Sequence, residues 1–378
     1  MSAVGGLTLT LLIGPGGLPA PVPRVVLDAL VGVQVTITAG QRSGFLLTFA
    51  VGKTSKLLTT LLPVGYFDPP NRVILAVTVG GSTTVIMDGV ITRQTMTPSN
   101  EPGQSTLALI GEDVSRMMDV IEIPGIPYPA MPAEGRVLFI LAKDAPLGLI
   151  PVVLPSVMVG DVELPTSKIR THRGTDLKYL THLAARVGYV FYVEPGPAPG
   201  TNVAYWGPEI KVGPPQPALS VNFDAHSNVE ALSFSFDGFA KSLFVVMIHE
   251  EKTGVSFPIP VPDVTPLSPP LGLKVPLPLR LRKVPEVANA SPLQAAAIGL
   301  ARAARSADVI TARGSLDVLR YGHILRARRL VEVRGAGRTY DGPYFVRSVT
   351  HVIRRGEYKQ SFELSRNAQI PYTSGVST

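Results

Sequence analysis

The stretch YDGPYFVRSVTHVIRRGEYKQSFELSRN, residues 340–367, contains two strand-like segments separated by Arg355-Gly356. In the second segment Tyr358, Phe362 and Leu364 share one face, while lysine, serine and glutamate occupy the other. This alternation is the period of a strand with one buried face. The stretch therefore predicts a β-hairpin that turns at Arg355-Gly356.

A second stretch, NRVILAVTVGGSTTVIMDGVITRQTMTPSNEPGQSTLALIGED (residues 71–113), has the layout of residues 328–367. In each, an apolar strand is followed by a turn, a second strand, a polar turn with glycine and a closing strand. Two related β modules in one chain would produce this pattern. The matching positions are Asp88-Gly89 and Asp341-Gly342 as tight turns, Gly103 and Gly356 in the polar turns, and Leu107 and Leu109 where Phe362 and Leu364 stand.

The composition limits the class of protein. The 378 residues suffice for two to four domains, and 36 glycines with 36 prolines favour short strands and turns. The sequence has no cysteine, which excludes disulfides, thiolate metal sites and a cysteine nucleophile. Charged residues and prolines interrupt the most apolar region, so we expect no stable membrane insertion.

The chain is predicted to be mainly β with α+β insertions. One clear helix follows Thr175, a capping residue, and ends before Gly188. We expect two related β-barrel modules plus a helix-containing α+β domain. The expected parts are a first β-barrel module at 1–110, an α+β domain at 111–215, a second β-barrel module at 216–254 and 309–368, a proline-rich excursion and helix inserted at 255–308, and a tail at 369–378.

Sequence motifs for catalysis are missing. No G-x-S-x-G elbow occurs, and Gly52-Lys53-Thr54 lacks the earlier glycine of a phosphate loop, because Leu47 stands there. The six histidines are scattered; His182 is expected to be a partly exposed structural residue, and His351 a strand-face or interface residue. We therefore assign no catalytic, cofactor-binding or metal-binding residues, and no cofactor.

Three stretches carry a resemblance to a known family: GTDLKYLTHLAARVGYVFYVEPG, GSLDVLRYGHILRARRLVEVRGAG and the hairpin of residues 340–367. In this order they resemble the baseplate hub proteins of contractile phage tails and injection systems. The family includes late control protein D and the hub part of the type VI valine-glycine-repeat spike protein. Its closing hairpin typically includes a histidine, and in this chain that histidine is His351. The likeness covers about residues 1–368.

The resemblance implies a structural protein without catalytic residues. It implies a homotrimer whose pseudo-sixfold ring joins the hexameric tail tube to the trimeric spike. The implied partners are the tube protein or a tube-initiator ring, a separate spike protein and baseplate wedge proteins, with DNA or effector cargo passing through the channel. The implied location is the virion tail baseplate or an assembled injection particle, made in the bacterial cytoplasm.

Two other functions stay open on the sequence. One is a tail-associated cell-envelope hydrolase, which a muralytic assay on the purified protein would reveal. The other is a nucleic-acid-binding β protein, because residues 280–366 hold 17 Lys and Arg against 7 Asp and Glu. Tight DNA binding with a steep salt dependence would favour that second function.

Overall fold

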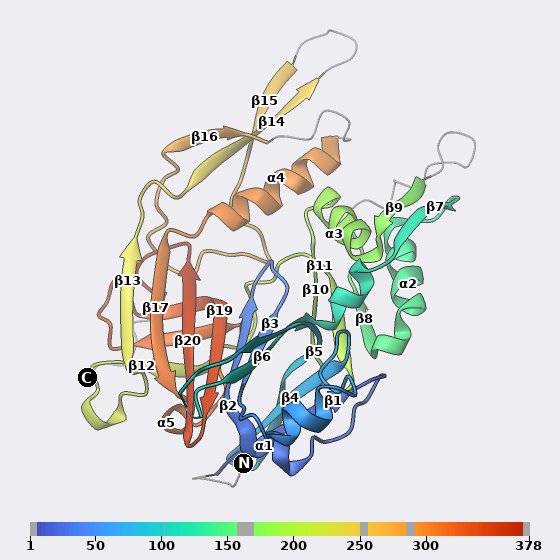
Figure 1. Cartoon of the computed structure of the whole chain (residues 1–378). Helices are drawn as coiled ribbons and strands as arrows, with labels where there is room; N and C mark the ends of the chain where they lie inside the picture. Colours follow the sequence, from blue (N-terminus) through green and yellow to red (C-terminus); the bar gives the residue numbers. More distant parts are fainter. Residues whose placement is uncertain (1–5, 102, 157–169, 250–255, 285–291, 373–378) are drawn as a thin grey trace.

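The computed structural model describes residues 6–101, 103–156, 170–249, 256–284 and 292–372 (Figure 1). The fold is mainly β, and the first part of the chain forms six strands with a short helix and one helical turn, Leu57–Leu61, between them. These elements are β1 (Leu7–Gly14), α1 (Arg24–Ala29), β2 (Leu30–Thr38), β3 (Gly44–Ala50), β4 (Arg72–Val79), β5 (Ser82–Thr97) and β6 (Thr106–Asp113).

The last part of the chain forms a second set of six strands, which begins near the middle of the sequence. A short helix, α5 (Val318–Tyr321), and a helical turn, Asp224–His226, lie between them. The six strands are β12 (Gln216–Ser220), β13 (Ala231–Phe236), β17 (Ile310–Asp317), β18 (Leu330–Arg334), β19 (Gly342–Arg354) and β20 (Glu357–Arg366).

The two sets have the same strand order. The first runs β1-β4-β5-β6-β3-β2, and the second runs β12-β18-β19-β20-β17-β13. Each strand therefore takes the position of its counterpart, from β1 with β12 to β6 with β20. One pair differs in direction, because β1 and β4 are antiparallel while β12 and β18 are parallel. We call the two sets the first and second β modules.

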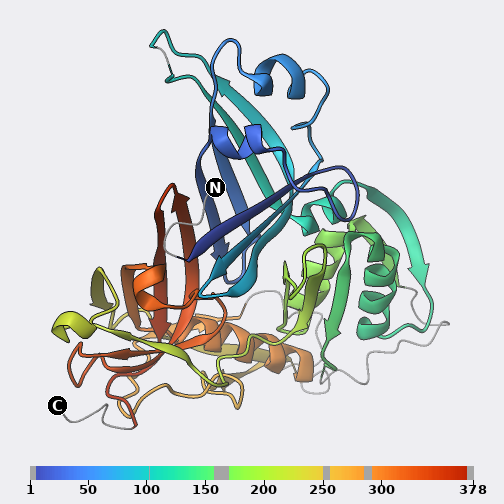
Figure 2. The same ribbon diagram turned by 90° about the horizontal axis from the view of Figure 1, so that it is seen from below.

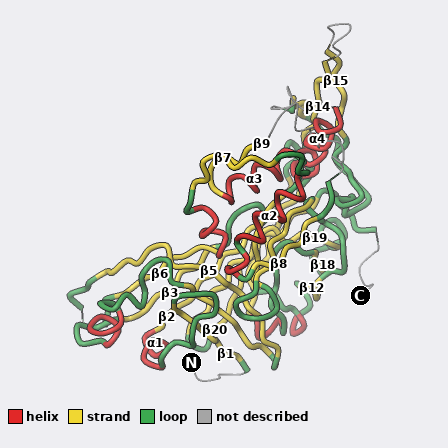
Figure 3. The backbone as a smooth tube through the Cα atoms, turned by 90° about the vertical axis from the view of Figure 1, so that its right-hand side faces the viewer, coloured by secondary structure: helices red, strands yellow, loops and turns green. Residues whose placement is uncertain are grey.

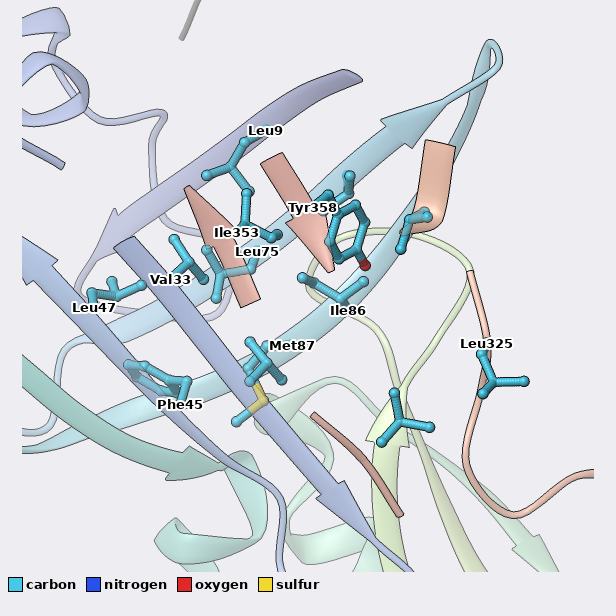
Figure 4. Close-up of a cluster of buried hydrophobic side chains, with 14 of the residues drawn as sticks. Leu9, Val33, Phe45, Leu47, Leu75, Ile86, Met87, Leu325, Ile353 and Tyr358 are labelled. Atoms are coloured by element: carbon cyan, nitrogen blue, oxygen red, sulfur yellow. The ribbon is translucent and has the colours of Figure 1, made fainter. Parts of the chain in front are cut away.

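The two modules are joined edge to edge by β2 and β19. The result is one 12-stranded sheet (Figure 1), in place of two separate barrels. Among the described residues its strand path runs from β1 to β13 without closing. A single hydrophobic core also spans the junction: Figure 4 shows Val33 and Leu47 of the first module beside Ile353 and Tyr358 of the second. Burial of this shared core stabilises the two modules as one body.

Between the modules, the chain forms a smaller α+β unit with its own core, which includes the buried Trp206 (Figure 3). Thr175 caps α3 through a hydrogen bond from the Lys178 N–H, as its position before the helix predicted. The elements are β7 (Glu122–Tyr128), α2 (Ala133–Lys143), β8 (Leu149–Val153), β9 (Arg170–Thr175), α3 (Asp176–Arg186), β10 (Val190–Pro195) and β11 (Asn202–Gly207), with helical turns at Val114–Asp119 and Ala145–Leu147.

A further unit is inserted between β13 and β17. It consists of a three-stranded sheet, in the order β15-β14-β16, and a helix that packs on it. Pro258 and Pro260 lie in β15, an edge strand of this sheet, where a missing N–H is tolerated. The first of these strands starts before residue 255, where the insertion was expected to begin. The elements are β14 (Ser242–His249), β15 (Ser256–Val261), β16 (Arg280–Lys283) and α4 (Pro292–Ser306).

The hairpin prediction is confirmed, and one turn prediction is wrong. β19 and β20 are joined by Arg355-Gly356, where Gly356 has φ of +78°. Asp88-Gly89, however, lies inside β5, and the chain reverses at Gly80-Gly81 instead. The dipeptide can stand in a strand because the Asp88 side chain has a buried ionic partner there.

The register of the repeat also differs from the sequence alignment by two residues. Each long strand has an irregularity that skips one residue, Thr92 in β5 and Arg347 in β19. When these bulges are aligned, Leu109 of the first module is equivalent to Phe362 of the second, and Gly111 is equivalent to Leu364. A shift of two residues keeps every side chain on its face, so the face pattern alone did not determine the register.

Candidate functional site

The most informative site is the junction between the modules, which we define as residues 32–38 of β2 paired with 348–354 of β19. The strands are antiparallel, and Thr36 and Thr350 face each other with their Oγ1 atoms 3.2 Å apart. On the other face Val33, Val35 and Ile353 are buried in the shared core. β19 is long enough to pair with β18 before the bulge and with β2 after it.

His351 lies at the centre of this junction, directly opposite Val35. Its side chain is buried, and its Nδ1 atom is 2.7 Å from the Tyr358 hydroxyl and 3.3 Å from Gln360 Nε2. Burial, with a smaller effect of the Arg326 charge, lowers the pKa of His351 to about 3. A neutral imidazole that is only 2% exposed fits the predicted strand-face role.

His351 should make the fold sensitive to acid. Its pKa lies at about 3 in the folded chain against an ordinary 6.5, so the unfolded chain binds the proton first as the pH falls. Its contribution is complete above pH 6.5 and is lost between pH 6.5 and 3. From pH 7 to pH 5 we expect a loss of about 2 kcal/mol in the free energy of unfolding.

Urea unfolding at pH 7 and pH 5 measures this loss. A His351→Asn chain should lose less stability over the same interval, although it starts from a lower value. The exposed His182→Asn chain is the matched control. Equal pH dependence in the His351→Asn and unaltered chains would contradict the assignment.

A buried ion pair connects the first module to the α+β unit. Arg72 of β4 donates from Nε and Nη2 to the Asp88 carboxylate of β5, at 2.7 and 2.9 Å. Asn202 of β11 donates to the same carboxylate at 3.1 Å, and Arg72 also donates to the carbonyl of Leu147. Burial raises the pKa of Asp88 even beside this guanidinium. The cluster fixes how the two units meet.

A second buried carboxylate, Asp308, connects segments of the second module with the chain that follows the α+β unit. It accepts from Lys211 Nζ at 2.9 Å, Arg347 Nη2 at 3.0 Å and Ser365 Oγ at 2.7 Å. Burial opposes ionisation, but the cations outweigh it and hold the pKa of Asp308 below its usual range. Arg347 is the bulge residue of β19, so this network fixes the bulge.

The basic C-terminal region is partly internal. Arg366 is fully buried and donates to the carbonyls of Leu271 and Asp341, and Arg347 belongs to the Asp308 network. Arg328 lies over the Tyr192 ring at 4.2 Å and within 3.7 Å of Glu194. These three arginines therefore serve the fold, whereas others of the region, such as Arg320 and Arg354, are exposed.

Arg326 and Arg329 are two exposed arginines of the basic region that lie next to each other in space. Together with Arg328 they line a pocket of about 420 Å³ that also contains His351 and residues 82–86 of β5. Burial, and then the nearby Arg329, lowers the pKa of Arg326. The lining also includes Glu194, which lies 3.7 Å from Arg328, and the three arginines outnumber this carboxylate, so the pocket wall is electropositive.

The α+β unit contains a polar cluster that the sequence did not reveal. His172 is buried, with Nδ1 2.9 Å from the Tyr128 hydroxyl and Nε2 3.7 Å from Asp176. Tyr179 stacks on its ring at 4.4 Å, and Lys143 pairs with Asp176. Such a triad-like set can resemble an active site, but His172 is only 1% exposed. The cluster ties α2, α3 and β9 together.

Asp144, beside this cluster, should reduce stability at neutral pH. Burial and the neighbouring Asp176 raise its pKa from 3.8 to about 6. Folding therefore favours the protonated carboxyl, and the cost appears as the pH rises through 6. Asp144→Asn is expected to increase the free energy of unfolding by about 1 kcal/mol at pH 8. The gain should vanish near pH 4 in urea unfolding; a gain that persists there would have another cause.

The remaining predicted residues are placed as follows. His182 is exposed on α3, and Leu47 is buried in the core of the first module. Within the described ranges no group of three or more His, Asp or Glu could hold a metal ion. No helix in that part of the chain is long and apolar enough to cross a membrane.

Comparison with known proteins finds similar folds among solved structures. No protein-family model and no curated protein matches the sequence. Solved structures do match: the 43 kDa tail protein of prophage MuSo2 from Shewanella oneidensis superposes with a TM-score of 0.62 at 14% identity, over 96% of this chain and 100% of that one. This chain has the fold of phage tail proteins. The tail protein from Neisseria meningitidis MC58 gives 0.60 at 15% identity, over 96% and 97%.

The same fold occurs in secretion machinery. A chain of the Francisella PdpA–VgrG complex gives a TM-score of 0.56 at 9% identity, over 98% of this chain and 55% of that one. An Escherichia coli protein, described as a type VI secretion component with similarity to phage T4 tail proteins gp27 and gp5, gives 0.51 at 12% identity, over 91% and 74%. The resemblance to proteins of phage tails and injection systems is thereby confirmed for the fold.

Proposed function

We propose that this chain is the structural baseplate hub of a contractile tail or injection system. In this proposal a homotrimeric, pseudo-sixfold ring joins the hexameric tail tube to the trimeric spike. The observation that carries it is the repeat of two six-stranded modules with one topology in a single chain. Three such chains supply six similar modules, the number needed to match a sixfold tube while keeping threefold symmetry toward the spike.

In the ring, the first and second β modules, joined in one sheet, form the wall. The α+β unit and the unit inserted between β13 and β17 project from it. The tube protein or a tube-initiator ring would stack on one side, the spike on the other, and baseplate wedge proteins around the rim. DNA or effector cargo would pass through the opening. The function is mechanical rather than catalytic, and it places the chain in the tail baseplate or injection particle.

Exposed apolar side chains support an assembled state. Leu273, Leu277, Leu279 and Leu281 are between 61% and 80% exposed in the single chain. Leu138 and Phe139 of α2 are about half exposed as well. Apolar patches of this kind on a single chain mark surfaces that other proteins cover. A mean hydropathy of +0.26 agrees with a chain that buries further surface on assembly.

Immunogold labelling of purified particles tests the proposal. Antibody against this chain should label one position, at the spike end of the tail tube, and particles from a deletion strain should lack assembled tubes. Label along the tube or on the particle head would contradict a hub. Release of peptidoglycan fragments by the purified chain would instead favour the envelope hydrolase.

A further inference from the structure

The last strand of the 12-stranded sheet, β13, is paired along one edge and open along the other. β13 pairs with β17 on one side, and within the described residues its other edge makes no backbone hydrogen bond. Figure 1 shows β13 as the outermost strand of the second module. Ser233 and Ser235 are exposed on one face, and Phe236 is 43% exposed on the other. An open strand edge is a template for pairing with another chain.

A second open edge lies on the hairpin of β5 and β6, whose end extends beyond the other strands of the first module (Figure 2). Up to Val90, β5 is paired with β4 on one side; residues 93–97 pair with β6 on the opposite side only. All five of these residues are exposed, including Met96 at 37%. In the described structure the β4-side edge of residues 93–97 has no backbone partner.

The second module shows what belongs on such an edge. There β19, the counterpart of β5, pairs with β18 before its bulge and with β2 after it, on the same side. The counterpart of β2 is β13. Within one chain β13 cannot reach β5, because six strands separate them in the sheet. We propose that β13 of one copy pairs antiparallel with residues 93–97 of β5 in the next copy, repeating the internal junction between modules.

The repeat also gives the register of this pairing. Aligning the bulges at Thr92 and Arg347 matches Thr95 with Thr350, and the module order matches Ser235 with Thr36. The pair Thr36–Thr350 therefore becomes Ser235–Thr95 between copies. The neighbouring in-register pairs are Ser233–Thr97, Phe234–Met96, Phe236–Gln94 and Asp237–Arg93.

The chemistry of these pairs agrees with the register. Ser235 and Thr95 would repeat the hydroxyl contact that Thr36 and Thr350 make at 3.2 Å. Arg93 would face Asp237, which places opposite charges together across the strands. On the core face, Phe236 and Met96, both exposed in the single chain, would be covered. A one-residue slip would send these apolar side chains to the wrong face.

Each chain thus offers one donor edge and one acceptor edge, so the contact is head-to-tail. Such contacts close into rings or continue as filaments. That the ring closes after three copies rests on the proposed function; the edge pairing and its register rest on the repeat. The two claims can therefore fail separately.

Disulfide trapping tests the register, because the chain has no cysteine of its own. Two in-register variants are Thr95→Cys with Ser235→Cys, and Thr97→Cys with Ser233→Cys. The matched control is Thr95→Cys with Ser233→Cys, which uses the same strands two residues out of register. In-register sulfurs fall within disulfide reach, whereas diagonal residues are about 7–8 Å apart. After oxidation, a non-reducing gel should show covalent trimers for both in-register variants and little product for the control.

The outcomes separate the two claims. Cross-linked chains longer than three would support the edge pairing and contradict the three-copy ring. A trimer by light scattering that gives equal or no cross-linking in all three variants would overturn the edge pairing and leave the ring. A chain that stays monomeric and uncross-linked would overturn both. All four positions are exposed, and circular dichroism of each reduced variant verifies its fold.

Discussion

Asp88→Ala is expected to lower the free energy of unfolding by about 3–5 kcal/mol, because it leaves the Arg72 guanidinium buried without its carboxylate. The Arg72 side chain is 5% exposed and that of Asp88 is 0% exposed, so water cannot replace the lost partner. Asn202, which donates to the same carboxylate, would lose an acceptor as well. Urea unfolding at neutral pH measures the loss.

Replacing both charged residues by apolar ones separates the attraction within the ion pair from the desolvation of its two charges. Burial raises the pKa of Asp88, which indicates that desolvation of the two charges opposes folding. Removing only one partner is still strongly destabilising, because the other charge is left buried and unpaired. Arg72→Met with Asp88→Leu should therefore be more stable than Asp88→Ala alone. The exposed pair Arg24–Asp28, at 3.8 Å, provides the control: Asp28→Ala should change stability by less than about 0.5 kcal/mol. A loss of similar size at both sites would contradict the argument.

Gly111→Leu is expected to cost at least about 3 kcal/mol, because the core of the first module has no room for it. A Cβ atom at Gly111 would lie 2.1 Å from Phe45 Cζ and 2.3 Å from the Val90 carbonyl oxygen. Phe45 stands directly opposite Gly111 across β3 and β6. In the second module the same pair is Ala312 opposite Leu364. The two modules thus place the large residue on different strands.

Phe45→Ala with Gly111→Leu copies the arrangement of the second module, so it should recover part of the loss. Phe45→Ala alone should cost about 3–5 kcal/mol through the cavity it creates. Recovery is partial because the Val90 carbonyl still has to move. Urea midpoints of the three chains decide: a double variant as unstable as the sum of the two single changes would show that the modules are not equivalent at this position.

The sequence revealed local structure well where one pattern was sufficient. Alternation placed Tyr358, Phe362 and Leu364 on the buried face, and the cap at Thr175 placed α3. The repeat was also visible in the sequence, but its register was not. The bulges at Thr92 and Arg347 shift each strand by one residue, and no residue type marks them.

The wider architecture depended on contacts that spacing in sequence cannot show. The pairing of β2 with β19 joins segments about 300 residues apart, so two separate barrels were expected where one continuous sheet exists. Asp88 in the apolar run VIMDGVI held an unused signal. A lone carboxylate among buried residues implies a buried cation or donors nearby, and the turn reading overlooked this. The His172 cluster assembles from distant segments and left no local signal.

The most direct test of the account is the mass of the purified chain by light scattering coupled to gel filtration. Three chains of 40.2 kDa form a particle of about 121 kDa, and that is the predicted mass. It should persist on dilution, since the contacts are backbone pairing and apolar burial. A mass of 40.2 kDa at every concentration would contradict a trimeric hub.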